Sequence, residues 1–181
     1  MKRSIPFLVV ALLCMQTGGS AVAQSARVYT DPDGAFRLKL PSGWKAERES
    51  EEGGSKTSIS SDRYNGKLLI LAARVPKDAK RSARLKRDLL TGMSAPYFEG
   101  WVNALKEQAR VEAGKIYSTT MGGLDALRRD VTYYRGDSSD PRKGYAIFTL
   151  GEGTVIFLGL TGNAEGYAIL DRIISGIEVE P

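Results

Sequence analysis

Short runs of alternating apolar and polar residues, separated by glycine-containing turns, restrict this chain to a fold built around a β-sheet. The alternation is clearest where Phe36, Leu38 and Leu40 alternate with Arg37 and Lys39. A period of two places one side of a strand in the core and the other in water. Similar β-type segments occur at residues 28–30, 45–49, 57–61, 67–75, 115–120, 124–134, 144–150 and 154–160. We therefore expect a sheet of at least five strands.

The pattern changes to helical spacing in two places. Leu85, Leu89 and Met93 repeat every four residues, Gly92 interrupts them, and Pro96 suits the first turn of a new helix. The sequence thus predicts helices over residues 79–92, 95–109 and 164–175. Strands, then helices, then strands and a last helix are typical of an α+β domain whose sheet is mainly antiparallel. We expect a single domain over residues 24–181.

The N-terminus has the three parts of a secretory signal peptide. Lys2 and Arg3 precede an apolar run over residues 7–15, and small residues follow at Ala21-Val22-Ala23. That run is far shorter than the roughly 20 residues that span a bilayer. We therefore expect residues 1–23 to be removed, leaving a periplasmic or secreted chain without a transmembrane segment. The alternative, a lipid anchor on Cys14, is less favoured because Leu13 rather than a small residue precedes the cysteine.

The composition excludes several chemistries. The chain has no histidine, and its one cysteine lies in the expected signal. The commonest general base, the thiol nucleophile and the usual zinc and copper ligands are therefore missing from the expected mature chain. We expect no catalytic residue, no cofactor and no bound metal. The 26 Lys and Arg against 21 Asp and Glu, two of the cations being in the signal, give too mild an excess to predict nucleic-acid binding.

Two short motifs suggest chemistry but are better explained as turns. Ser42-Gly43-Trp44-Lys45 matches the S-x-x-K pattern of serine acyltransferases, in which the serine opens a helix. Here Pro41 and Gly43 favour a turn between strands instead. Asp31 and Asp33 resemble the start of a calcium loop, but the later ligands are missing. A hydrolase that uses carboxylates alone stays open as an alternative.

The segment Phe36-x-Leu38-x-Leu40-Pro41-x-Gly43-Trp44 near the mature N-terminus resembles the PsbP-like family. The glycine at 123 before a strand, the hairpin over residues 145–160 and the helix ending Ile173-Ile174-Ser175 fit the same family. That family includes the photosystem II extrinsic protein and exported bacterial proteins resembling DcrB. The resemblance implies a curved antiparallel sheet flanked by helices, and a function in binding other proteins.

The first predicted helix carries the most informative charges. Lys77, Lys80, Arg84 and Arg87 share one face, opposite the apolar stripe. Cations near a helix N-terminus oppose the helix dipole, and like charges four residues apart repel, so this cluster does not stabilise the helix. The four residues are therefore our candidate partner-binding site. The alternatives are a merely solvated helix face, or contact with lipid headgroups or a cell-wall polymer. Trp44 and Trp101 are expected to be core or helix–sheet contacts, the alternative being stacking on a ligand.

Overall fold

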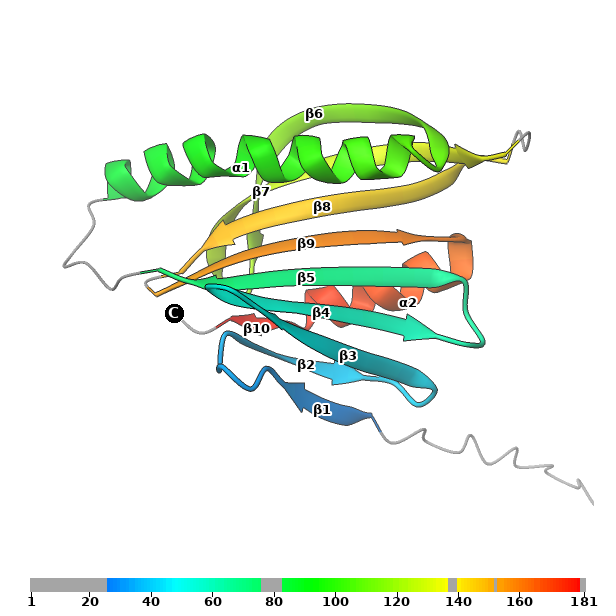
Figure 1. The fold of residues 1–181 in the computed structure, drawn as a ribbon, viewed down its shortest axis with the longest axis horizontal. Helices are drawn as coiled ribbons and strands as arrows, with labels where there is room; N and C mark the ends of the chain where they lie inside the picture. The colour runs from blue at the N-terminus through cyan, green and yellow to red at the C-terminus, as the bar shows by residue number, and fades with distance from the viewer. Residues whose placement is uncertain (1–25, 76–82, 137–139, 152, 180–181) are drawn as a thin grey trace, which may run out of the picture.

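The computed structural model describes residues 26–75, 83–136, 140–151 and 153–179, which form two sheets and two helices (Figure 1). The elements follow in the order β1 (Arg27–Thr30), β2 (Phe36–Leu40), β3 (Trp44–Glu51), β4 (Gly54–Ser61), β5 (Gly66–Arg74), α1 (Ala83–Lys106), β6 (Ala109–Met121), β7 (Leu124–Arg135), β8 (Arg142–Leu150), β9 (Thr154–Gly162), α2 (Ala164–Ser175) and β10 (Glu178–Val179). The predicted α+β class, with an antiparallel sheet flanked by helices, is confirmed.

The larger sheet is antiparallel throughout and joins two groups of neighbouring strands. Its order is β3-β4-β5-β9-β8-β7-β6, so β5 and β9 meet in the middle although a helix and three strands separate them in the chain. The remaining strands form a separate sheet in the order β1-β2-β10. The sequence pattern predicts strands but does not say which strands pair, so this division into two sheets was not foreseen.

Tight turns at glycine connect the antiparallel neighbours. Gly122 and Gly123 have φ values of 58° and 81° and make the two-residue connection between β6 and β7. Positive φ at both positions is the geometry that matches the right-handed twist of a hairpin. The glycine pair therefore fixes the register in which Met121 faces Leu124.

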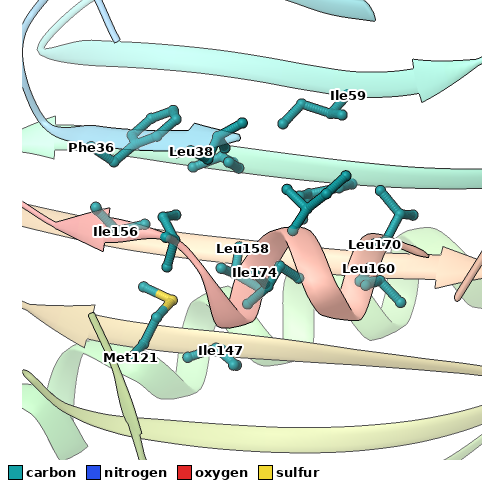
Figure 2. Packing of buried hydrophobic residues seen from close by; sticks show 14 of the residues in the cluster. Phe36, Leu38, Ile59, Met121, Ile147, Ile156, Leu158, Leu160, Leu170 and Ile174 are labelled. Carbon is teal, nitrogen blue, oxygen red and sulfur yellow. The ribbon is translucent and has the colours of Figure 1, made fainter. Parts of the chain in front are cut away.

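One face of the large sheet is closed by α2 together with the small sheet. Figure 2 shows the side chains of this layer, which come from both sheets and from α2 and point into one interior. Leu38, Ile59, Leu158 and Leu170 are at most 2% exposed. Burial of this apolar surface is the main force that holds the two sheets and α2 together.

Of the described elements, α1 is the one that covers the opposite face, where it packs on β6, β7 and β8 (Figure 1). Phe98 of α1 is fully buried against Phe157 of β9, with their rings in edge-to-face contact at 6.0 Å. An ion pair of 2.6 Å joins Arg129 Nη1 of β7 to Glu99 Oε1, and Arg129 Nε donates to the Gly114 carbonyl in β6 at 3.0 Å. These contacts fix α1 over one half of the sheet.

The prediction of two helices between residues 79 and 109 was wrong. A single helix, α1, runs from Ala83 to Lys106 with Pro96 inside it, and Ala109 already belongs to β6. Pro96 has no backbone N–H, so the carbonyl of Gly92, four residues earlier, lacks its helical partner. Gly92 is exposed, so water can hydrate that carbonyl. Leu90 and Phe98, on either side of that turn, are both buried in the same cluster. Packing on the sheet therefore outweighs the local break. Residues 79–82 lie outside the described part of the chain.

Candidate functional site

A groove of about 680 Å³ lies between the first half of α1 and the β6–β7 hairpin. We call it the α1–β6 groove. Lys86, Arg87 and Thr91 of α1 form one wall, and Ser118 and Thr119 of β6 contribute to the other. The floor is apolar and includes Leu90, Leu127 and Leu150. Ammonium, guanidinium and hydroxyl groups all donate hydrogen bonds, so this groove suits a ligand rich in acceptors and negative charge.

Arg87 is the one member of the candidate basic face whose side chain the structure describes. It is exposed, lies in the wall of the α1–β6 groove, and is joined there by its neighbour Lys86. Arg84 belongs to the start of α1, but its side chain lies outside the described residues, as do Lys77 and Lys80. The structure therefore neither brings the four cations together nor separates them.

The hydroxyl wall opposite Arg87 was not predicted from the sequence. Ser118, Thr119 and Thr120 form a run of hydroxyl residues just before the Gly122-Gly123 turn, and that run was the available signal. What turns it into part of a site is the packing of α1 across β6 and β7, which brings together segments far apart in the chain. Asp125 also lines the groove and supplies its one described acidic group.

The most connected polar cluster lies on the other face, between β6, β7, β8 and α2. Arg128 Nη2 contacts Asp130 Oδ1 at 2.8 Å, and Tyr117 donates its hydroxyl to Asp130 Oδ2 at 2.7 Å. The Arg128 guanidinium lies 3.7 Å from the ring centroid of Tyr145, whose hydroxyl donates to Asp171 Oδ1 at 2.8 Å. Two carboxylates are thus tied to donors from neighbouring elements.

The electrostatics of this cluster favour a structural role. Burial and the hydrogen bond to Asp171 raise the pKa of Tyr145 far above its usual value, so its phenol stays protonated at neutral pH. Burial lowers the pKa of Arg128, but the hydrogen bond and charge attraction to Asp130, together with the nearby tyrosines, outweigh that effect and raise it. A general acid or base needs a pKa near the working pH. Tyr145 and Arg128 instead keep their protons firmly and hold the strands to α2.

The Asp31–Gly34 segment is a clamp for the turn between β1 and β2. Asp31 is 1% exposed, and its Oδ2 accepts from the backbone N–H groups of Asp33 and Ala35, both at 3.2 Å. Arg48 Nε of β3 lies 3.4 Å from Asp31 Oδ1, and the same guanidinium binds Asp33. Both carboxylates therefore have protein donors, as turn chemistry predicts. Within the described ranges no group of three metal-ligating side chains comes together.

The S-x-x-K motif lies in a turn, as the sequence predicted. The amide of Trp44 donates to the Pro41 carbonyl at 3.2 Å, and Gly43 has φ of 81°. Ser42 and Lys45 are therefore not on one face of a helix, which is the arrangement that the acyltransferases need. Trp44 is buried in the main core, and half-buried Trp101 packs α1 onto the sheet, so the two are a core contact and a helix–sheet contact, as expected.

Comparison with known proteins shows the fold. No protein-family model and no curated protein sequence matches this chain. The solution structure of the cyanobacterial PsbP protein CyanoP from Synechocystis sp. PCC 6803 superposes with a TM-score of 0.62 and 15% identity. The match covers 92% of this chain and 99% of CyanoP. This chain has a PsbP-like fold. The resemblance predicted from the sequence is confirmed at the level of the fold.

Two further solved structures share this arrangement. A Bacteroides thetaiotaomicron protein matches with a TM-score of 0.52 and 15% identity, over 87% of this chain and 49% of that one. LpqN, a Mycobacterium tuberculosis protein involved in cell envelope biogenesis, matches with a TM-score of 0.50 and 12% identity, over 87% and 91%. At such identities the arrangement of elements is shared, and no residue role carries over. Neither described helix of this chain is long and apolar enough to cross a membrane.

Proposed function

We propose that this protein is an exported, non-catalytic binding protein that holds an acidic segment of a partner protein in the α1–β6 groove. The observation that carries the proposal is the facing of Arg87 and Lys86 towards a hydroxyl wall across an apolar floor. An acidic peptide offers carboxylates to the cations, backbone carbonyls to the hydroxyls and apolar side chains to the floor. Charge-assisted hydrogen bonds are the strong ones in such an arrangement.

The shape of the site supports a peptide rather than a lipid surface. Arg87 borders a hollow of about 680 Å³, whereas a bilayer or a polymer layer presents its charges on a broad front that a projecting basic face contacts best. In addition, β6 is the edge strand of the large sheet, and within the described part of the chain no strand pairs with its outer side. An extended segment entering the groove can pair with such an edge.

The carboxylate-dependent hydrolase is less well supported. It needs two carboxylates that converge on a substrate, one of them protonated. Asp171 borders a small cavity of about 310 Å³ together with Arg128, but its Oδ1 already accepts from Tyr145. Asp130 is held by Arg128 and Tyr117. Both carboxylates are therefore engaged by protein donors from neighbouring elements, and they do not converge on one substrate-sized space.

Site-specific photo-crosslinking in the native compartment tests the proposal. A photoreactive residue at Ser118, inside the groove, should capture an acidic protein, and one at exposed Asn103 of α1, outside it, should not. The pair Lys86→Gln and Arg87→Gln should reduce capture several-fold, and higher salt should reduce it further because exposed charges are screened. The charge-matched control is Lys39→Gln with Arg172→Gln, which removes two exposed cations that do not line the groove.

Two outcomes would contradict the proposed binding, and a third would contradict the expected signal cleavage. Equal capture by both double variants would remove the groove cations from binding. Sedimentation of the wild-type protein with phosphatidylglycerol vesicles, lost in the Lys86 and Arg87 variant, would favour the lipid-surface alternative. Recovery of a chain that starts at lipid-modified Cys14 instead of Gln24 would overturn the expected signal cleavage.

A further inference from the structure

A second cavity, of about 620 Å³, lies at the C-terminal end of α1, away from the α1–β6 groove. It is bounded by the end of α1, the β4–β5 loop and the ends of β5, β7 and β9. We call it the Trp101 pocket after the side chain at its base. Its volume falls within the roughly 300–1,000 Å³ of small-molecule sites. No residue of the α1–β6 groove lines it.

The base of the Trp101 pocket is apolar and depends on one glycine. The indole of Trp101 lies against Gly159 of β9, where an added Cβ would be 2.5 Å from the indole Nε1. Only glycine therefore lets the ring lie this close to the strand. Trp101 is only half-buried, because Leu69 of β5 and Leu105 of α1 border the same cavity without filling it. An apolar surface is left open beside the sheet.

The rim of the Trp101 pocket is basic. Arg63 comes from the β4–β5 loop, Lys67 from β5 and Arg135 from the end of β7. Among the residues that the structure describes, none of these three cations forms an ion pair with a carboxylate. The one acidic group of the lining, Asp62, is bound to Lys45 at 2.6 Å. Three like charges around one hollow repel each other, which a bound anion would relieve.

We propose that the Trp101 pocket binds a small amphipathic anion. Its apolar body lies on Trp101, Leu69 and Leu105, and its carboxylate or phosphate head is held by Lys67, Arg135 and Arg63. Concave apolar surface with a few convergent polar groups is the usual composition of a ligand site. This pocket and the α1–β6 groove share no lining residue, so each of the two proposals can be tested independently of the other.

Calorimetric titration of the mature protein with four probes tests the ligand class. Octanoate and octyl phosphate carry the two heads on one apolar body, 1-octanol is the body without charge, and inorganic phosphate is the head alone. We expect at least one of the charged octyl compounds to bind about tenfold more tightly than 1-octanol and than inorganic phosphate. The better of the two identifies the head. No binding of either, or equal binding of 1-octanol, would overturn the proposal.

Variants then locate the site. Ala104, exposed on α1 and part of the lining, is replaced by tryptophan to fill the cavity, and Asn103→Trp is the matched control beside it, outside the lining. Filling should abolish binding, and the control should leave it unchanged. Lys67→Gln with Arg135→Gln should weaken binding about tenfold or more, whereas Lys86→Gln with Arg87→Gln should not affect it. Unchanged binding in the Ala104→Trp protein, with unfolding midpoints equal to wild type, would place the ligand elsewhere.

Discussion

The two faces of the seven-stranded sheet are covered in different ways. On one face α2 and the β1-β2-β10 sheet close over a continuous core, and Leu38, Ile59 and Leu158 are at most 2% exposed. On the other face α1 is the one described element over β6, β7 and β8, with cavities of about 620 and 680 Å³ near its two ends. A single α-helix is about 10–12 Å across with its side chains, so α1 leaves part of the seven-stranded sheet uncovered on this face.

This difference separates stability from binding within one domain. Side chains on the closed face have little room to change without leaving voids or orphaned charges, so substitutions there should reduce the free energy of unfolding strongly. Side chains beside α1 border open space and carry exposed cations, so substitutions there should change binding more than stability. The four predictions below test this contrast.

The largest effect is expected from truncating one leucine on each face. Leu158→Ala in the closed core should lower the free energy of unfolding by about 3 kcal/mol, because a fully buried leucine leaves a cavity. Leu69→Ala, on the neighbouring strand but bordering the Trp101 pocket, should lower it by less than about 1 kcal/mol. Urea unfolding measures both. Equal losses would mean that the α1 face is packed as tightly as the other.

A somewhat smaller loss is expected at the Asp31 clamp. Asp31→Asn should destabilise the fold by about 2 kcal/mol, because it removes the charge that pairs with partly buried Arg48 and disturbs the acceptor of two backbone amides. The comparison is Asp62→Asn, which breaks an exposed ion pair with Lys45 and should leave urea stability unchanged. A larger loss at Asp62 would contradict the clamp.

The Tyr145 hydrogen bond should show itself in the pH dependence of stability. Tyr145→Phe should cost about 1–2 kcal/mol at pH 8, since Asp171 loses a partly buried donor. The pKa of Tyr145 is raised above the value of about 10 that the unfolded chain has, so its contribution is complete below pH 10 and is lost as the pH rises further. Wild-type stability should therefore fall more between pH 9 and pH 11 than that of the variant. Parallel curves from urea unfolding at each pH would exclude Tyr145 as the source.

The smallest effect is a gain. Gly92 lies in the middle of α1, is exposed, and has open space where a Cβ would be added. Gly92→Ala should therefore raise the free energy of unfolding by about 0.5–1 kcal/mol, the helix preference of alanine over glycine. Thermal unfolding monitored by circular dichroism measures it. A loss of stability would indicate that the helix breaks here after all.

What the sequence could predict depends on how local the cause is. The last helix was expected at residues 164–175 and lies at Ala164–Ser175, because Asn163 caps its first turn and Ile173 and Ile174 mark its buried side. The break expected between Gly92 and Pro96 does not occur, because Leu90 and Phe98 pack on residues of β8 and β9. Those residues are distant in the sequence, so the local pattern does not reveal their effect. A local capping residue determines where a helix begins or ends, whereas packing on the rest of the molecule determines whether a long helix continues without a break.

The candidate site shows the same limit. Arg87 could be selected from helical spacing and charge alone, but the groove in which it lies requires α1 to pack on β6 and β7. The cations of the Trp101 pocket come from a loop and the ends of two strands, and no sequence spacing connects Arg63 with Arg135. Sites assembled from separate segments become visible only when the topology is known.

The pairing of β5 with β9 has a consequence for the order in which this protein can fold. Strands β3, β4 and β5 emerge early, but β5 gains its second neighbour only with residues Thr154–Gly162. Pairing between strands so far apart in the chain is slow, since a long loop must close before any contact forms. A chain that becomes available from its N-terminus onward therefore cannot complete the middle of the large sheet until residues Thr154–Gly162 are present.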